Sequence, residues 1–159
     1  MRFKMLPFIF VEKFPLYDTA EVFVVRIDST IELTEEFLKS LYYLLWFPGY
    51  FGFNWDALYD CLCDLSWLPC RKIVLLHDSL PQIPKVDLQI YLEILRDSVL
   101  DWINDEEHEL EVVFLASDRS LIESLIMLKK WTSIVRVINA YQRKSCSGRY
   151  NLAKNNGKY

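Results

Sequence analysis

Residues 48–64 read PGYFGFNWDALYDCLCD, and this stretch carries the strongest structural signals in the chain. Asn54 is a residue type that caps helices, and the residues after it repeat with helical spacing. We therefore predict a helix from Trp55 to about Leu65. The apolar face of this helix, which must pack against a core, consists of Leu58, Cys61, Leu62 and Leu65.

The opposite face of the predicted helix is acidic. It presents Asp56, Tyr59, Asp60 and Cys63, with Asp64 at its edge. Aspartates four residues apart on a helix repel by roughly 0.2–0.5 kcal/mol per pair, and no Lys or Arg occurs from residue 40 to residue 70. Two interpretations remain open: solvated acids near a helix N-terminus, or a surface that binds a basic partner.

Aromatic residues crowd the segment just before this helix. Tyr50, Phe51, Phe53 and Trp55 lie so close together that some of them must be exposed. Aromatic side chains beside charge are typical of binding hot spots, in which Tyr and Trp act as anchors. The neighbourhood therefore favours a binding surface, although the residues alone do not decide the matter.

Short apolar runs alternate with amphipathic segments along the rest of the chain. Thr34 is a candidate cap for a helix that ends before Pro48, and Phe8–Val11 fits either an edge strand or a packed extension. The expected strands are 22–27, 73–76, 110–115 and, further on, 134–138; the other expected helices are 86–103 and one that Asp118 or Ser120 opens, running to about 130.

This alternation predicts a small α/β domain with a parallel sheet of three or four strands packed by helices. We expect an N-terminal extension over 1–20, the main domain over 21–117, and an added helix with a possible extra strand of the same domain over 118–144. Residues 145–159 read as a flexible basic tail.

Charge is distributed unevenly along the chain. The first 123 residues hold 22 acids and 10 bases, a balance of −12, whereas the last 36 hold eight bases and no acid. An acidic body favours a basic partner and argues against nucleic-acid binding by the main domain. The basic end leaves open an RNA- or ribosome-associated role.

The sequence favours neither a metal site nor an enzyme. Cys61 and Cys63 point roughly 200° apart around a helix, and no C-x-x-C pair is present to join Cys70 and His77 in a zinc site. Asp56 and Asp60 have the spacing of a carboxylate pair, but a convex helix turn forms no substrate cleft. We expect no catalysis and no cofactor, and we interpret His77 as structural.

The chain is expected to be cytoplasmic. Its first residues, MRFKMLPFIFV, are interrupted by Lys4 and Pro7 and lack a cleavage site of small residues, unlike a signal peptide. No run of about 18 apolar residues is present that could span a membrane.

The segment FPGYFGFNWDALYDCL, residues 47–62, resembles the signature of the barstar family, the intracellular inhibitors of barnase-type ribonucleases. The shared pattern is an apolar residue and Pro, an aromatic-Gly loop, and Asn-x-Asp-Ala-Leu-aromatic-Asp-Cys-Leu. Agreement runs without gaps from Thr34 to Pro69 and more loosely to Leu115. The resemblance implies a three-stranded parallel sheet packed by helices and a protein that plugs a ribonuclease active site.

The resemblance also implies roles for individual residues. Tyr50 matches a loop tyrosine that packs on the nuclease, and Gly52 and Asn54 match the edge of the contact. Asp56 and Asp60 match the aspartates that enter the cationic substrate pocket in place of RNA phosphate. The predicted partner-binding residues are Tyr50, Gly52, Asn54, Trp55, Asp56, Tyr59 and Asp60.

Some positions depart from the family pattern. Tyr59 replaces an interface tryptophan, and Leu65 stands where the family has another tryptophan, although Trp67 lies close. A later acidic interface residue has no secure counterpart; the candidates are Asp101, Asp105 or neither. The short inhibitors have no equivalent of the first 20 residues or of those beyond Ala116.

Together these features predict an immunity protein, a monomer when free, that binds one ribonuclease or related toxin with a basic active site. We expect it to bind neither nucleic acid nor a membrane. Two alternatives stay open: the RNA- or ribosome-associated module, and a scaffold that dimerises through its aromatic loop.

Overall fold

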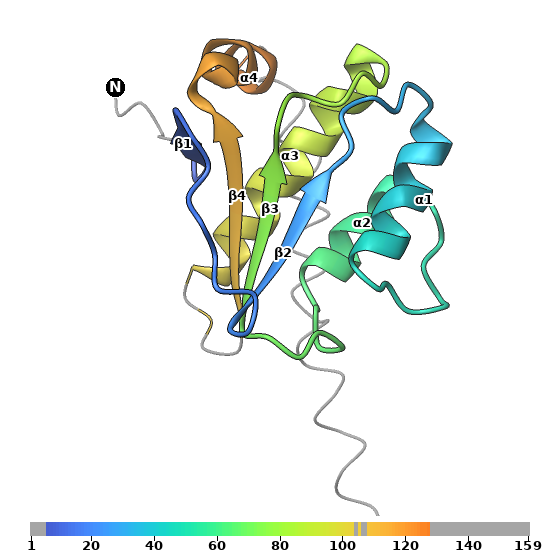
Figure 1. Ribbon diagram of the computed structural model, residues 1–159. Coiled ribbons are helices and arrows are strands. Elements are labelled where there is room, and N and C mark those ends of the chain that lie inside the picture. The colour runs from blue at the N-terminus through green and yellow to red at the C-terminus, as the bar shows by residue number, and fades with distance from the viewer. Residues whose placement is uncertain (1–5, 104, 106–107, 128–159) are drawn as a thin grey trace, which may run out of the picture. The chain divides into compact units, whose positions relative to one another are not determined.

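Four parallel strands form one sheet in the computed structural model, which describes residues 6–103, 105 and 108–127 (Figure 1). The strand order is β1-β4-β3-β2. The strands are β1 (Ile9–Val11), β2 (Val22–Ile27), β3 (Lys72–His77) and β4 (Glu109–Leu115). Val22 lies beside Lys72, and Lys72 lies beside Glu109, so the three longer strands start level with one another. A parallel α/β sheet is what the alternating pattern predicted.

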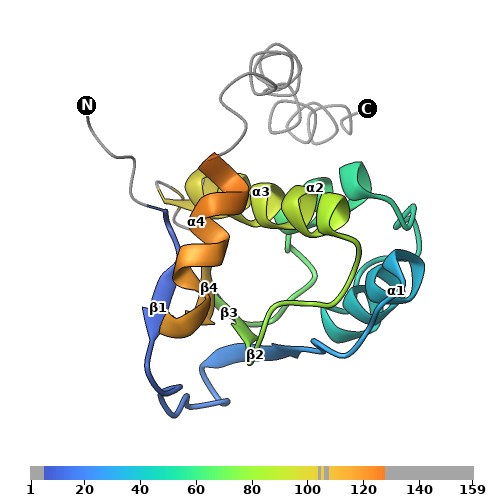
Figure 2. The same cartoon turned by 90° about the horizontal axis from the view of Figure 1, so that it is seen from above.

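Four helices pack on one face of this sheet (Figure 2). They are α1 (Thr34–Leu44), α2 (Trp55–Leu62), α3 (Lys85–Trp102) and α4 (Arg119–Met127), the last preceded by a 3-10 turn at Ala116–Asp118. Residues of all four helices share one core cluster with β-strand residues such as Ile73 and Phe114. The opposite sheet face buries Val74, Leu76 and Val113 under the segment between β1 and β2.

The fourth strand of the sheet comes from the N-terminal end. Of the two possibilities for Phe8–Val11, the edge strand is correct: Ile9 lies beside Val113, and the rings of Phe8 and Phe10 pack on Phe114. The strand predicted at 134–138, the tail 145–159 and the end of the last helix at about 130 lie outside the described residues. The described residues up to Ile126 form one compact unit.

Two expected helix boundaries need correction. Thr34 does not cap α1: Leu33 holds the cap position with extended backbone and no side-chain cap, and the Thr34 hydroxyl donates to Asp87 on α3 at 2.6 Å. Helix α2 ends at Leu62 rather than Leu65, because Leu65 has a left-handed backbone (φ 48°) that no helix continues. Leu65 is nevertheless fully buried, as predicted.

His77 ends β3 inside the core and has no access to solvent. Its ring stacks on Phe114, with Nε2 2.9 Å from the Tyr91 hydroxyl and Nδ1 3.3 Å from the Val113 carbonyl oxygen. Both ring nitrogens of a neutral imidazole are therefore satisfied, the proton lying on Nδ1. Burial lowers the pKa of His77 to about 3. The structural role predicted for His77 is confirmed.

Candidate functional site

Helix α2 begins at the cap that the sequence predicts. The Asn54 side chain accepts a hydrogen bond from the Ala57 N–H at 2.8 Å and donates one to the Gly52 carbonyl at 3.2 Å. The first bond satisfies one of the free N–H groups at the helix start, and the second holds the side chain in place. Asp56 in the first turn adds a favourable charge at the positive end of the helix.

The faces of α2 divide as the helical period predicts. Leu58, Cys61 and Leu62 are buried in the core, while Asp56 and Asp60 are exposed on the other side. Burial, with Asp60 and Asp64 nearby, raises the pKa of the Cys61 thiol to about 11, so this cysteine stays protonated. The outward face of α2 is therefore acidic in the folded protein.

Tyr59 and Cys63, which were predicted to face outward, turn partly towards α3. The Tyr59 hydroxyl donates to the Asp101 carboxylate at 2.5 Å, and the Cys63 sulfur lies 3.6 Å from the same oxygen. Burial, followed by the hydrogen bond to Asp101, raises the pKa of Tyr59. The Asp101 carboxylate is thus held against α2 and joins the acidic face from a different helix.

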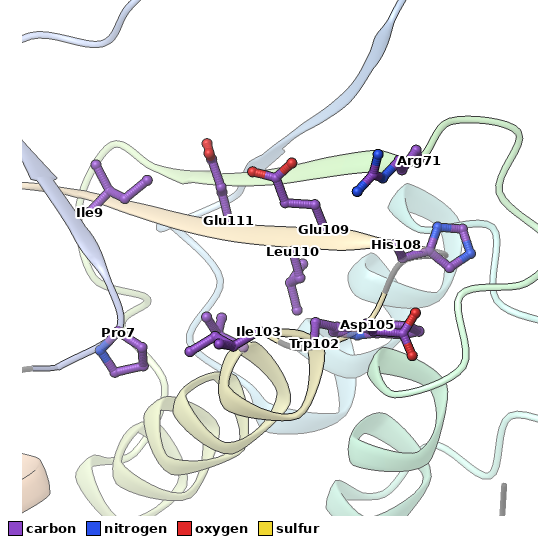
Figure 3. Close-up of a pocket in the computed structure, with 11 residues that line it drawn as sticks. Pro7, Ile9, Arg71, Trp102, Ile103, Asp105, His108, Glu109, Leu110 and Glu111 are labelled. Carbon is purple, nitrogen blue, oxygen red and sulfur yellow. The ribbon is translucent and has the colours of Figure 1, made fainter.

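Of the two later acids that the sequence suggested, Asp101 accepts a hydrogen bond from Tyr59 of α2. Asp105 lines a separate pocket of about 430 Å³ between the end of α3 and the start of β4 (Figure 3). The apolar part of that pocket contains Trp102 and Leu110, and Arg71 and Glu109 lie on its sheet side. The geometry therefore favours Asp101 as the third acid.

Trp55 is half-buried and turned towards α3. Its indole N–H donates to Asp87 at 3.1 Å, and the other carboxylate oxygen of Asp87 accepts the Thr34 hydroxyl. One carboxylate thus ties the first residues of α1 and α2 to the first turn of α3. This contact gives the Trp55 indole a role in positioning α2. The predicted role of Trp55 in partner binding stays a prediction.

The loop between α1 and α2 buries some of its aromatic rings and exposes others. The Phe51 N–H donates to the Pro48 carbonyl at 2.9 Å, closing a turn that places Phe51 in the core and Tyr50 in solvent. Phe51 packs between Phe47 and Phe53, with ring centroids 4.8 and 5.0 Å away. The expectation that some of these aromatics are exposed is confirmed.

Bulky residues hold strained backbone on both sides of this loop. Trp46 (φ 53°) follows α1, and Phe53 (φ 50°) directly precedes the Asn54 cap. A left-handed conformation costs an L-residue about 1–2 kcal/mol because Cβ crowds the backbone. Strain of this kind clusters at binding and active sites.

A larger residue at Gly52 would press on the side chain that caps α2. A Cβ atom at this position would lie 3.0 Å from Nδ2 of Asn54. We predict that Gly52→Ala lowers the free energy of unfolding by about 1 kcal/mol, the usual value of a lost N-cap, measurable by urea denaturation. Gly49→Ala is the matched control, because a Cβ there meets nothing within 4 Å.

A double-mutant cycle shows whether Gly52 acts through the cap. We expect Gly52→Ala to cost little more in an Asn54→Ala background, since the capping side chain is already gone. Additive losses would contradict this explanation and assign Gly52 another role.

In the described part of the chain, no cluster of three or more His, Cys, Asp or Glu side chains is placed to hold a metal ion. None of the helices within 6–103 and 108–127 has the length and apolar character needed to cross a bilayer.

Residues 22–115 match the family model described as Barstar (barnase inhibitor). The chain belongs to the barstar family. The match begins with β2 and ends with β4, so it contains the loop, α2 and Asp101 and leaves β1 and α4 as additions to the matched region. A search of the curated proteins gave no match. Members of the barstar family are inhibitors rather than enzymes, and their partner is a ribonuclease, a protein. The resemblance drawn from residues 47–62 is therefore confirmed.

The sequence analysis missed Asp87, and it offered Asp101 only as one of two candidates for a later acidic residue. Each lies on α3, more than 30 residues from its partner on α2. The signal for Asp101 was the family's later acidic interface residue, which did not distinguish Asp101 from Asp105.

Proposed function

We propose that this barstar-family chain is an immunity protein that blocks the active site of a basic ribonuclease toxin in the cytoplasm, where it protects RNA. The observation that carries the proposal is the outward face of α2, where Asp56 and Asp60 are exposed, together with the Asp101 carboxylate that Tyr59 of the same helix holds. A site that binds RNA phosphates must present Arg, Lys or His, and carboxylates at similar spacing can occupy it.

The parts of the face have different tasks in this proposal. Asp56 and Asp60 enter the basic cleft, and Tyr50 on the adjacent loop provides an exposed ring as an anchor. Tyr59 supplies a half-buried ring, and its bond to Asp101 fixes that carboxylate before binding. A preformed face loses less entropy on association than one that must first be ordered.

The direct test is a titration of barnase with the purified chain while RNA cleavage is measured. We expect inhibition that is complete at one molecule of chain per molecule of nuclease. Uninhibited cleavage at micromolar concentrations of the chain would overturn the proposal for nucleases of this type. The chain alone should cleave no RNA.

Association should depend strongly on salt. Opposite charges on two proteins accelerate their encounter, and ions screen this attraction beyond about 10 Å at 0.1 M. We predict that the association rate constant falls at least about tenfold between low and high ionic strength, as measured by stopped-flow fluorescence. The dissociation rate should change much less; an association rate indifferent to salt would argue against charge steering.

The basic end of the chain supports one competing function, an RNA- or ribosome-associated module. Residues 124–159 hold eight bases and no acid. Deleting 145–159 separates the two, because it should leave nuclease inhibition intact under our proposal. The competing function would be favoured by two results together: the shortened chain no longer binds RNA, and the full chain does not reduce RNA cleavage by the nuclease.

A further inference from the structure

An exposed aromatic strip lies beside the acidic face. It consists of Tyr43, Trp46 and Phe53, which are 74%, 59% and 45% exposed, and it is separate from Tyr50, which the proposed contact already uses. Tyr43 stacks edge-on to Tyr42 at 5.1 Å, and Tyr42 contacts Phe53 at 5.2 Å. Phe53 directly precedes the cap of α2. Ring contacts through Tyr42 therefore join Tyr43 at the end of α1 to Phe53 at the start of the acidic helix, and Trp46 belongs to the loop between them.

Local structure does not explain why these rings are outside. Trp46 occupies the left-handed position just after α1, where glycine is the usual residue, and its ring touches only the edge of Phe23 at 5.0 Å among the described aromatic contacts. Phe53 is left-handed as well. Both residues retain a large exposed ring at a position that a glycine would occupy without strain, which favours a role in contact with another molecule.

We infer that the aromatic strip is a second contact area for the same nuclease, whose surface carries an apolar shelf beside its basic cleft. This inference rests on the proposed function and specifies the partner further. Two molecules could cover the strip, the nuclease or a second copy of the chain, and charge favours the nuclease. A symmetric pair joined at the strip would bring two acidic α2 faces to one junction, and like charges across an interface are unfavourable. A basic protein can contact the strip and the acidic face of α2 at the same time without such repulsion.

Calorimetric binding to barnase tests the inference with four variants. Trp46→Gly and Tyr43→Ser should each weaken binding about tenfold, as expected when an interface aromatic ring is lost. Trp46→Gly should leave Tm nearly unchanged, since relief of the backbone strain offsets the lost Phe23 contact. Leu121→Ser on α4, another exposed apolar side chain, is the matched control and should bind like the unchanged chain.

The fourth variant, Asp60→Ala, separates the two hypotheses. If it weakens binding while Trp46→Gly and Tyr43→Ser bind within twofold of the unchanged chain, the aromatic contact is overturned and the proposed function stands. If Asp60→Ala also has no effect, or the unchanged chain does not bind barnase, the proposed function fails and the inference falls with it. Light scattering that shows a dimer dissolved by Trp46→Gly would assign the strip to a second copy.

Discussion

Asp60→Ala is expected to weaken nuclease binding by about two to three orders of magnitude while leaving the fold intact. Removing one member of a desolvated ion pair costs about 2–5 kcal/mol, since the partner's cation then stays buried without its counter-charge. Asp60 is exposed in the free protein and lies four residues from both Asp56 and Asp64. Its removal relieves repulsion and introduces a better helix former, so Tm should stay the same or rise slightly.

A surface acid on another element provides the control for charge alone. Glu12 is exposed just after β1, at the sheet edge opposite β2. Glu12→Ala removes the same charge and should reduce affinity only slightly, through long-range attraction. A fall in Tm of Asp60→Ala with unchanged affinity per folded molecule would assign Asp60 a structural role and contradict the proposed site.

The stability of the folded chain should decrease below pH 6.5 because of His77. Unfolded, this histidine takes up a proton with a pKa near 6.5, whereas in the core its pKa is lowered to about 3 and it stays neutral. The unfolded state therefore binds the extra proton, and the free energy of unfolding falls as the pH falls. The expected loss between pH 7 and pH 5 is about 2 kcal/mol, measured by urea denaturation.

His77→Gln isolates this contribution. The glutamine amide can donate an N–H to the Val113 carbonyl and accept from the Tyr91 hydroxyl, and it does not take up a proton in this pH range. The variant is expected to be less stable at pH 7, yet to lose about 2 kcal/mol less than the unchanged chain between pH 7 and pH 5. Equal losses in both proteins would show that other groups cause the acid sensitivity.

Much of the site could be predicted because it depends on residues close in sequence. The cap at Asn54 and the division of α2 into a buried and an acidic face follow from side-chain type and helical period alone. The family signature occupies the same stretch. The error at Thr34 has the opposite cause: its hydroxyl bonds to Asp87 on a distant helix, a contact that overrides the local capping preference.

The parallel α/β class, the acidic outward face of α2 and the family could all be predicted before the fold was known, since each follows from local spacing or from one continuous motif. Three-dimensional packing was needed to show that Asp101 is bonded to Tyr59 of α2, that Ile9–Val11 completes the sheet, and that Trp46 stays exposed while Phe51 is buried. These outcomes depend on how α3 packs on α2 and how the loop turns at Pro48. Such contacts join residues far apart in the chain, or depend on single backbone angles, and neither is encoded in a local repeat.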